Sequence, residues 1–364
     1  MDDEFQSLRE NETWELANES TATNLLSGKW VYRLKRGADG RITRYKARWV
    51  VRGFEQEYGI DYNETFASVV RQKTYRSLFA LAAIHDWEIE QMDVKTAFLY
   101  GPVNETIFVQ LPPGYQQPGK ACKLRKALYG LKQAPRVWFQ TLSKALAEFG
   151  FRRSQFDEAV FYKDNMILAV YVDDILIFGP QKTKIDEVKK QLNQKFKMTD
   201  LGPCEYFLGT KVTRDRAQKK IWLSQTAYLE RTLQNLGLTN LTPQNIPMEP
   251  GETLEPAPAD FEANAEDRQW YQSVIGSLMF AMIGTRPDLA YPISKLSRFM
   301  TNPTKEHRAA AIRVLKYVKK TLKLGLLFDG NLNQLIGYSD AEWARDRSDS
   351  KSIECYIFKL AVPQ

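Results

Sequence analysis

Two adjacent aspartates, Asp173 and Asp174, interrupt a strongly apolar stretch of the sequence, residues 166–178. The flanking residues are mostly isoleucine, leucine and valine, which are typical of buried β-strands. Burying a carboxylate without a partner is costly, so something must compensate the two charges. A hairpin turn would expose them to water, and a bound divalent cation would neutralise them, since Mg²⁺ prefers carboxylate oxygens. At this point both explanations stay open.

A third acidic residue, Asp93, lies near the end of another predicted strand, residues 87–94. If the two segments meet at their acidic ends, three carboxylates surround a site suited to two metal ions. Such a site supports in-line attack of a hydroxyl on an α-phosphate, because one ion activates the nucleophile and the other stabilises the leaving oxygen. The sequence has only two histidines and no GxxxxGK[ST] motif, which argues against histidine-assisted nucleophiles and a P-loop ATPase.

The remaining composition is typical of a soluble globular protein. At ~150 residues per domain, the 364 residues suggest two or three compact units. No uninterrupted apolar run approaches the ~18 residues of a membrane span. The acidic start of the chain resembles neither a signal peptide nor a transit peptide. Three cysteines far apart in the sequence favour neither disulfides nor a zinc site, so we expect an intracellular protein. Because no apolar run is long enough to span a membrane, we expect no membrane partner.

The net charge of +7 hides strong local differences. Residues 1–27 carry seven acids and one arginine, whereas residues 29–54 carry nine Lys or Arg and one acid. A second basic segment, residues 106–147, has seven Lys or Arg and no acid. Aromatic residues alternate with these cations, which is typical of surfaces that contact phosphates and stack on bases. Solvated faces would explain the charge equally well, so a nucleic-acid partner is one of two interpretations.

Hydrophobic periodicity and turn residues predict both helices and strands. Alternation in residues 29–36 and 42–51, joined by Ala38-Asp39-Gly40, predicts a basic β-hairpin. Helices are expected at residues 74–83, 134–149, 182–196, 224–238, 270–282, 290–299 and 305–322. Further strands are expected at residues 207–212, 221–223, 324–328 and 335–339. Five prolines between residues 243 and 258 indicate a linker.

Six ordered blocks resemble the reverse transcriptases of copia-type long-terminal-repeat retrotransposons. The signature block is Tyr171-Val172-Asp173-Asp174. The others are residues 46–53 (KARWVVRG), 91–101 (QMDVKTAFLYG), 128–136 (LYGLKQAPR), 206–209 (YFLG) and 286–291 (RPDLAY). A four-residue motif can arise by chance, whereas six blocks in order over nearly the whole chain do not.

The resemblance implies an α+β fold, a right-hand polymerase with fingers, thumb and an antiparallel palm sheet. It places an acidic leader at residues 1–27, the hand at 28–242, a proline-rich linker and helical connection at 243–330, and a truncated ribonuclease H-like start at 331–364. The implied function is an RNA-directed DNA polymerase that extends a primer on an RNA or DNA template with deoxynucleoside triphosphates. The alternative is a catalytically inactive, nucleic-acid-binding relic of a retrotransposon polyprotein.

The resemblance also assigns a catalytic centre. Asp93, Asp173 and Asp174 are the expected catalytic carboxylates, and they are expected to hold two Mg²⁺ (or Mn²⁺) ions. The backbone carbonyl of Val94 is expected to be a further ligand. A structural role in a turn, without catalysis, is the competing interpretation of the aspartates.

A nucleotide pocket is expected beside this centre. Lys46 and Arg48 of the basic hairpin are the candidates for the triphosphate, because a cation there offsets the charge that develops on pyrophosphate. Phe98 resembles the aromatic gate that would clash with a ribose 2′-hydroxyl. Tyr129 and Gly130 match the motif that lines the pocket, where glycine permits close backbone approach. Lys46 and Arg48 could instead contact the phosphate backbone of a nucleic acid or simply face water. Phe98 could instead be a core residue.

Two assignments fall later in the chain. Phe207, Leu208 and Gly209 resemble the primer-grip hairpin, although plain core residues would look the same. Asp340, within residues 337–344, resembles the first carboxylate of a ribonuclease H. One carboxylate cannot hold the two metals of that chemistry, so we expect no ribonuclease H activity. The resemblance further implies a cytoplasmic particle or the nucleus as the location, and it leaves the oligomeric state open.

Overall fold

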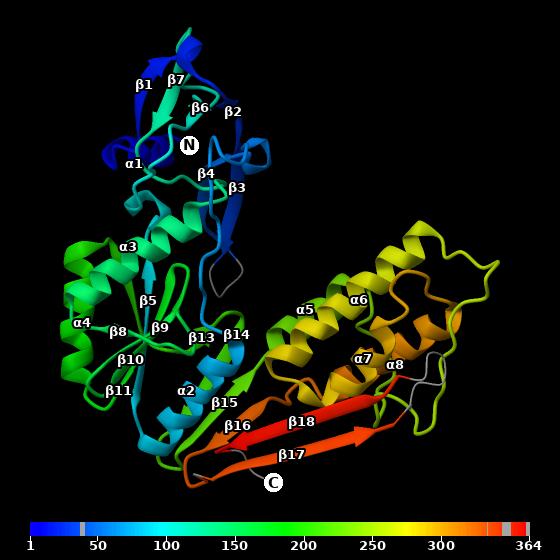
Figure 1. Ribbon diagram of the computed structural model, residues 1–364. Coiled ribbons are helices and arrows are strands. Elements are labelled where there is room, and N and C mark those ends of the chain that lie inside the picture. The colour runs from blue at the N-terminus through cyan, green and yellow to red at the C-terminus, as the bar shows by residue number, and fades with distance from the viewer. Residues whose placement is uncertain (37–40, 333, 344–350, 362–364) are drawn as a thin grey trace. The chain divides into compact units, whose positions relative to one another are not determined.

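The computed structural model describes residues 1–36, 41–332, 334–343 and 351–361 (Figure 1). These residues form a mixture of α-helices and several β-sheets, and they divide into two compact units. Unit 1 comprises Met1–Arg71 and Glu88–Pro203, and unit 2 comprises Gln72–Trp87 and Cys204–Gln364. Within the described ranges, the helices are all too short or too polar to cross a membrane.

Unit 1 contains an antiparallel sheet in the order β12-β5-β11-β10-β9-β8. Its strands are Met198–Pro203 (β12), Glu88–Val94 (β5), Asp174–Gly179 (β11), Met166–Tyr171 (β10), Val160–Lys163 (β9) and Arg152–Arg153 (β8). The apolar stretch with two central aspartates is therefore a hairpin of two central strands. Hydrophobic residues fill β10 and β11 because both strands lie inside the sheet.

Two helices pack on this sheet, α3 (Ala134–Glu148) and α4 (Lys182–Lys195). They match the helices predicted at residues 134–149 and 182–196. Their buried side chains share one core with the sheet, and Figure 1 shows both helices against its strands. Trp138 of α3 and Ile185 of α4 are fully buried there. The amphipathic periodicity of the two segments is explained by this contact.

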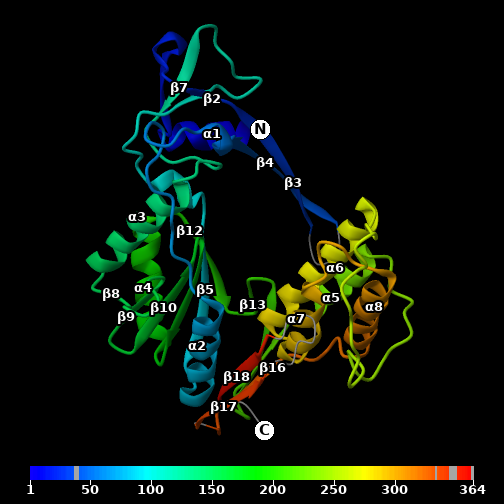
Figure 2. The same cartoon turned by 45° about the vertical axis from the view of Figure 1, so that its right-hand side comes forward.

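The other elements of unit 1 surround a second core. Helix α1 (Asp2–Glu10) packs against a hairpin of β3 (Gly28–Arg36) and β4 (Ile42–Val51), seen as a long ribbon in Figure 2. A small sheet follows the order β1-β7-β6-β2, with strands Trp14–Asn18, Lys120–Leu124, Phe108–Gln110 and Leu25–Leu26. The basic hairpin predicted from alternation is confirmed, while its Ala38-Asp39-Gly40 turn lies outside the described residues.

Unit 2 has a sheet in the order β13-β14-β15-β16. Its strands are Tyr206–Phe207, Thr210–Asp215, Lys220–Ser224 and Leu326–Asp329. Helix α2 (Gln72–His85) packs on β15 and β16, which are far from it in sequence. A two-stranded ribbon of β17 (Leu335–Glu342) and β18 (Ile353–Leu360) follows.

The helices of unit 2 share a separate core. They are α5 (Thr226–Asn235), α6 (Ala265–Gly284), α7 (Ala290–Ser297) and α8 (Lys305–Lys320), gathered together in Figure 2. Each overlaps a helix predicted from periodicity. The sequence signal is clear here because every helix has one face buried in the same core.

Two local predictions in unit 2 were wrong. The strand expected at residues 207–212 is broken by a turn, because Leu208 and Gly209 both have positive φ angles, 49° and 77°. Two consecutive residues of this kind connect the antiparallel strands β13 and β14. The helix expected from residue 224, which Ser224 would cap, begins only at Thr226: Ser224 ends β15, and Gln225 occupies the N-cap of α5 without a side-chain hydrogen bond.

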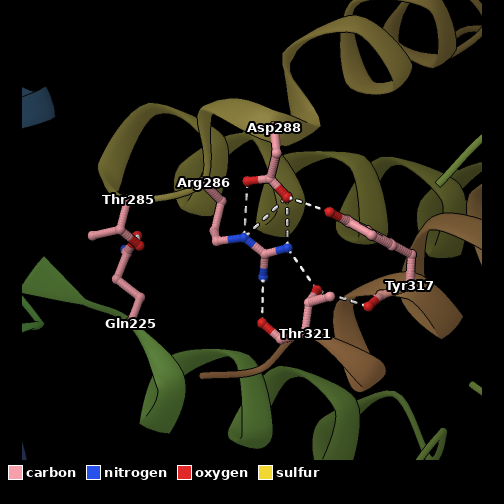
Figure 3. Close-up of polar contacts among 6 residues, drawn as sticks. All are labelled: Gln225, Thr285, Arg286, Asp288, Tyr317 and Thr321. Carbon is pink, nitrogen blue, oxygen red and sulfur yellow. Dashed lines mark hydrogen bonds and ion pairs between the residues drawn. The ribbon is translucent and has the colours of Figure 1, made fainter. Parts of the chain in front are cut away.

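The RPDLAY block folds around a buried arginine, Arg286, which is 0% exposed (Figure 3). Its Nη2 donates to Asp288 Oδ2 at 2.7 Å and its Nε to Asp288 Oδ1 at 3.0 Å. The same guanidinium donates to the carbonyl oxygen and the hydroxyl of Thr321, at 3.1 and 2.7 Å. Asp288 also accepts a hydrogen bond from Tyr317 at 3.0 Å. The block therefore ties the start of α7 to the end of α8.

A buried histidine, His307, caps α8 in its neutral form. Its Nδ1 accepts a hydrogen bond from the backbone N–H of Thr304 at 2.9 Å, so this nitrogen carries no proton. Its Nε2 lies 3.0 Å from the carbonyl oxygen of Glu255, and its ring stacks on Phe299. Burial lowers the pKa of His307, an effect that the carbonyl of Glu255 and the carboxylate of Glu306 partly oppose.

We expect the stability that His307 contributes to fall as the pH drops below ~6.5, the ordinary pKa of an unfolded histidine. The folded state holds His307 with a lowered pKa, so the unfolded state binds more protons in this range and is favoured. Thermal unfolding between pH 7.5 and 5.5 measures the effect. The stability of the wild type relative to His307→Gln should decrease as the pH falls over this range, whereas its stability relative to His85→Gln, at an exposed position, should stay constant. Equal profiles for the wild type and His307→Gln would contradict this prediction.

Candidate active site

The three predicted carboxylates meet at one end of the six-stranded sheet. Tyr171 pairs with Asp174 across the β10–β11 hairpin, and Asp174 pairs with Asp93 of β5. The backbone N–H of Val94 donates to the carbonyl oxygen of Asp173 at 2.9 Å. The register of β5 against β11 therefore brings Asp93 beside the aspartate pair.

The loop between β10 and β11 consists of Val172 and Asp173, and it is strained. Val172 has a φ of 56°, although the first residue of a two-residue loop with positive φ is ordinarily glycine. Its carbonyl oxygen accepts a hydrogen bond from Nε1 of the buried Trp138 at 2.7 Å. A β-branched residue in this conformation is rare and persists when its surroundings enforce it, which is common at functional sites.

The carboxylates of Asp93 and Asp174 lie on the sheet face opposite to α3 and α4. Successive strand residues alternate between faces, and their neighbours Met92, Val94 and Ile175 belong to the core beneath those helices. Asp93, Asp173 and Asp174 are half-buried. The hairpin turn considered from the sequence is thus present, but it does not place the carboxylates fully in water.

Negative charge accumulates at this point. Burial, together with the neighbouring carboxylates of Asp173 and Asp93, raises the pKa of Asp174 to about 6. The amide of Gln91, on the same face of β5, donates to Asp174 Oδ1 at 3.2 Å and partly opposes these effects. A cation would lower the energy of the ionised carboxylates.

The donor set suits a hard divalent cation in its chemistry, since carboxylate oxygens are what Mg²⁺ binds. Within the described ranges, however, no three side chains of His, Cys, Asp or Glu stand close enough together to hold a metal. The backbone therefore gathers the aspartates, while the orientation of their side chains does not form a closed metal centre. Metal binding, including the role of the Val94 carbonyl, stays a prediction.

The expected nucleotide residues form a contiguous group next to the aspartates. The guanidinium of Arg48 lies 4.7 Å from the ring centre of Tyr129, and the ring of Phe98 lies 5.0 Å from that of Tyr129. Burial raises the pKa of Tyr129, Arg48 lowers it, and Asp173 raises it. Phe98 is half-buried in the short helix Ala97–Tyr100 and packs against both cores of unit 1. Arg48 and Asp173 thus both act electrostatically on Tyr129.

Gly130 permits a close approach between two backbones. Its φ is +96°, and a Cβ at this position would lie 2.0 Å from the carbonyl oxygen of Val51 in β4. The backbone N–H of Val51 also donates to the carbonyl oxygen of Tyr129 at 2.8 Å. The contact fixes β4, which carries Lys46 and Arg48, beside Tyr129. Close approach of Gly130 to a nucleotide stays a prediction.

We expect Gly130→Ala to lower the free energy of unfolding by about 2–4 kcal/mol, because a left-handed backbone and a steric overlap act together. Gly114→Ala is the matched control: its φ is +93°, but nothing lies within 4 Å of the added Cβ. In that control the free energy of unfolding should fall by only ~1–2 kcal/mol, the cost of placing alanine in a left-handed conformation. Urea denaturation compares the two. Equal losses would show that the contact with Val51 contributes nothing.

The other predicted residues lie in unit 2. Phe207 is buried and its ring centre lies 5.3 Å from that of Tyr75 in α2, while Leu208 and Gly209 form the turn after it. Asp340 is exposed and pairs with Cys355 between β17 and β18. Phe207 thus packs as a core residue would, and the primer-grip and ribonuclease H assignments stay untested.

Two supporting residues escaped the sequence analysis. Gln91 donates a hydrogen bond to the carboxylate of Asp174, and Trp138 donates one to the carbonyl oxygen of the strained residue Val172. Gln91 lies two residues before Asp93, on the same face of β5, so strand alternation was the available signal. Trp138 gave no such signal, because its helical periodicity predicts only burial.

Comparison with known proteins identifies relatives of this chain. The family model described as reverse transcriptase (RNA-dependent DNA polymerase) matches residues 11–250. A retrovirus-related Pol polyprotein from transposon TNT 1-94 of Nicotiana tabacum is 40% identical, over 99% of this chain and 28% of the polyprotein. The corresponding polyprotein from transposon RE1 of Arabidopsis thaliana is 36% identical, over 99% of the chain and 25% of the polyprotein. A Saccharomyces cerevisiae protein named for transposon Ty5-1 is 33% identical, over 74% of the chain and 89% of that protein. The chain thus spans about a quarter of the length of the plant polyproteins.

Proposed function

Since the chain belongs to the reverse transcriptase family, in its copia-type retrotransposon branch, we propose that it is an RNA-directed DNA polymerase. The reaction joins the 3′-hydroxyl of a primer to the α-phosphate of a deoxynucleoside triphosphate, and pyrophosphate leaves. The observation that carries the proposal is the strand register that sets Asp93 opposite Asp174, with Asp173 hydrogen-bonded to Val94. The same fold without the three aspartates side by side would support nucleic-acid binding but not polymerisation.

In this proposal Asp93, Asp173 and Asp174 hold two Mg²⁺ (or Mn²⁺) ions, with the carbonyl of Val94 as a further ligand. When bound, the ions would supply activation of the hydroxyl and neutralisation of charge on the phosphates. The protein's own contribution is to hold the carboxylates in place. Gln91 orients Asp174, and Trp138 fixes the loop that carries Asp173.

The triphosphate would bind on the side of Arg48. That guanidinium lies over Tyr129, and Asp173 acts electrostatically on the same tyrosine, so a group bound there would stand near the carboxylates. Lys46 lies two residues earlier on the same strand and therefore on the same face. Phe98 packs edge-on against Tyr129 and would restrict the space around the sugar. Arg48 and Lys46 would offset charge that builds on the leaving pyrophosphate.

We further propose that the sheet β12-β5-β11-β10-β9-β8 is the palm and the basic hairpin β3–β4 part of the fingers. In unit 2, helices α5 to α8 would supply the thumb and connection, and the turn at Leu208 and Gly209 the primer grip. The template–primer is the expected partner, because cations and aromatic residues alternate along β3 and β4.

Primer extension by the purified protein tests the function. An RNA template with a DNA primer should be extended in Mg²⁺, and EDTA should abolish the reaction. Mg²⁺ should also raise the unfolding temperature of the wild type and not of Asp93→Asn. Salt-sensitive binding of template–primer without incorporation would instead identify a catalytically inactive relic.

A further inference from the structure

The hairpin of β3 and β4 has two chemically different faces. Its register pairs Trp30 with Trp49, and their ring centres lie 5.5 Å apart. Trp49 is buried in the same core as Leu8 of α1, so this face is turned toward the protein. Because successive strand residues alternate between faces, the residues between them lie on the other face. The paired residues of that face are Lys29 with Val50, Val31 with Arg48, and Arg33 with Lys46.

This second face is cationic, and two of its cations oppose each other directly. Neither strand contains an aspartate or a glutamate. Arg33 stands opposite Lys46, and like charges in a directly opposed pair destabilise a sheet. Arg33 is exposed, and its guanidinium forms no hydrogen bond or ion pair with the residues that the structure describes. An anion bound between the two side chains would relieve their repulsion.

The pairing places Arg33 within reach of any anion that Lys46 contacts. Directly opposed residues of an antiparallel pair have their Cβ atoms only ~4.5–5.5 Å apart, and their side chains extend from the same face. The residue opposite Arg48 is Val31, which carries no charge. A third cation is therefore available at the level of Lys46 and not at the level of Arg48.

The levels follow one another along the hairpin. Val51 is tied to the carbonyl oxygen of Tyr129 at 2.8 Å, and the guanidinium of Arg48 lies 4.7 Å from the ring centre of Tyr129. Lys46 and Arg33 lie two residues further from Val51, a distance of ~7 Å along the strands. In the proposed reaction the α-phosphate lies at the carboxylates, on the side of Tyr129. The pair of Arg33 and Lys46 would therefore meet the far end of a triphosphate.

We propose that Arg33, together with Lys46, binds the γ-phosphate of the incoming deoxynucleoside triphosphate, so that both strands of the hairpin hold the substrate. This inference rests on the proposed function, because it takes Arg48 and Lys46 as triphosphate ligands. A guanidinium suits the role, since its planar fork donates two parallel hydrogen bonds to a phosphate. Arg33 thereby distinguishes a nucleoside triphosphate from a diphosphate.

Binding of the next complementary deoxynucleoside triphosphate and of the corresponding diphosphate measures the effect. The full chain is used with Mg²⁺ and a template–primer whose primer ends in a dideoxynucleotide, which prevents incorporation. We expect Arg33→Gln to weaken triphosphate binding about tenfold, a low value for a charge-assisted hydrogen bond, and diphosphate binding less than about twofold. Arg33→Lys should recover part of the loss, because it keeps the charge without the fork.

Two further variants separate the hypotheses. Arg9→Gln is the matched control, since it removes the same charge from an exposed position of unit 1, and it should change either affinity less than about twofold. If Arg48→Gln leaves both affinities unchanged, the proposed triphosphate site is wrong. If Arg48→Gln weakens both, whereas Arg33→Gln changes neither or changes both equally, the site stands and the γ-phosphate role of Arg33 is wrong.

Thermal unfolding without nucleotide distinguishes substrate binding from a structural role. Arg33→Gln removes one of two opposed like charges, so the unfolding temperature should stay the same or rise. A loss of triphosphate affinity in a variant that is no less stable cannot be assigned to damage of the hairpin. A lower unfolding temperature would show that Arg33 stabilises the hairpin, and it would overturn the inference.

Discussion

Asp93→Asn, Asp173→Asn and Asp174→Asn are each expected to reduce primer extension roughly a thousandfold or more, well above the ~10–100-fold typical of residues that only support a metal ligand. Asparagine keeps the shape of the side chain and removes the charge. The expected loss follows from the register that gathers the three carboxylates. Gln91→Leu removes only the hydrogen bond to Asp174, so it should reduce primer extension by only ~10–100-fold.

The same substitutions should not weaken the fold. Burial and mutual repulsion raise the pKa of Asp174, so replacing a charge in this group relieves an unfavourable interaction. We expect unfolding temperatures equal to or above that of the wild type. Asp164→Asn is the matched control, because Asp164 is exposed and asparagine tolerates its φ of 51°. Wild-type extension by any of the three active-site variants would refute the assigned role of that residue.

Arg286→Ala is expected to lower the free energy of unfolding by about 2–4 kcal/mol, because it removes charge-assisted hydrogen bonds and the packing of a fully buried side chain, whereas Asp288 is 33% exposed and can be solvated. The substitution removes the guanidinium that donates to Asp288 and to both oxygens of Thr321, and Asp288 keeps the hydrogen bond from Tyr317 (Figure 3). Arg286→Lys should lose less, but it cannot reproduce the planar fork that contacts Asp288 and Thr321 together. Urea denaturation, followed by tryptophan fluorescence, measures both.

An exposed ion pair of unit 2 provides the comparison. Arg268 and Glu262 lie 3.5 Å apart, and the glutamate side chain is 88% exposed. Removing it by Glu262→Ala should change the stability by less than about 1 kcal/mol. If Arg286→Ala had an equally small effect, the network of the RPDLAY block would not stabilise the helical core.

Local sequence patterns predicted much of the secondary structure of this protein. Alternation found the hairpin of β3 and β4, and helical periodicity found α2, α3 and α4. These patterns succeed because each element buries one face, so apolar residues recur along the sequence with the period of a helix or a strand. They failed at Leu208, where a turn interrupts an apolar run, because a leucine with positive φ leaves no signal in the sequence.

The sequence by itself singled out the candidate residues for the chemistry: two aspartates in an apolar hairpin, a third near the end of a strand, and cations alternating with aromatic residues. The tertiary structure decided which of them meet. It set Asp174 against Asp93, and Gly130 against Val51. Gln91 and Asp174, for example, are 83 residues apart in the chain. Strand register and backbone contact over such separations depend on how the whole core packs, and no short pattern records that.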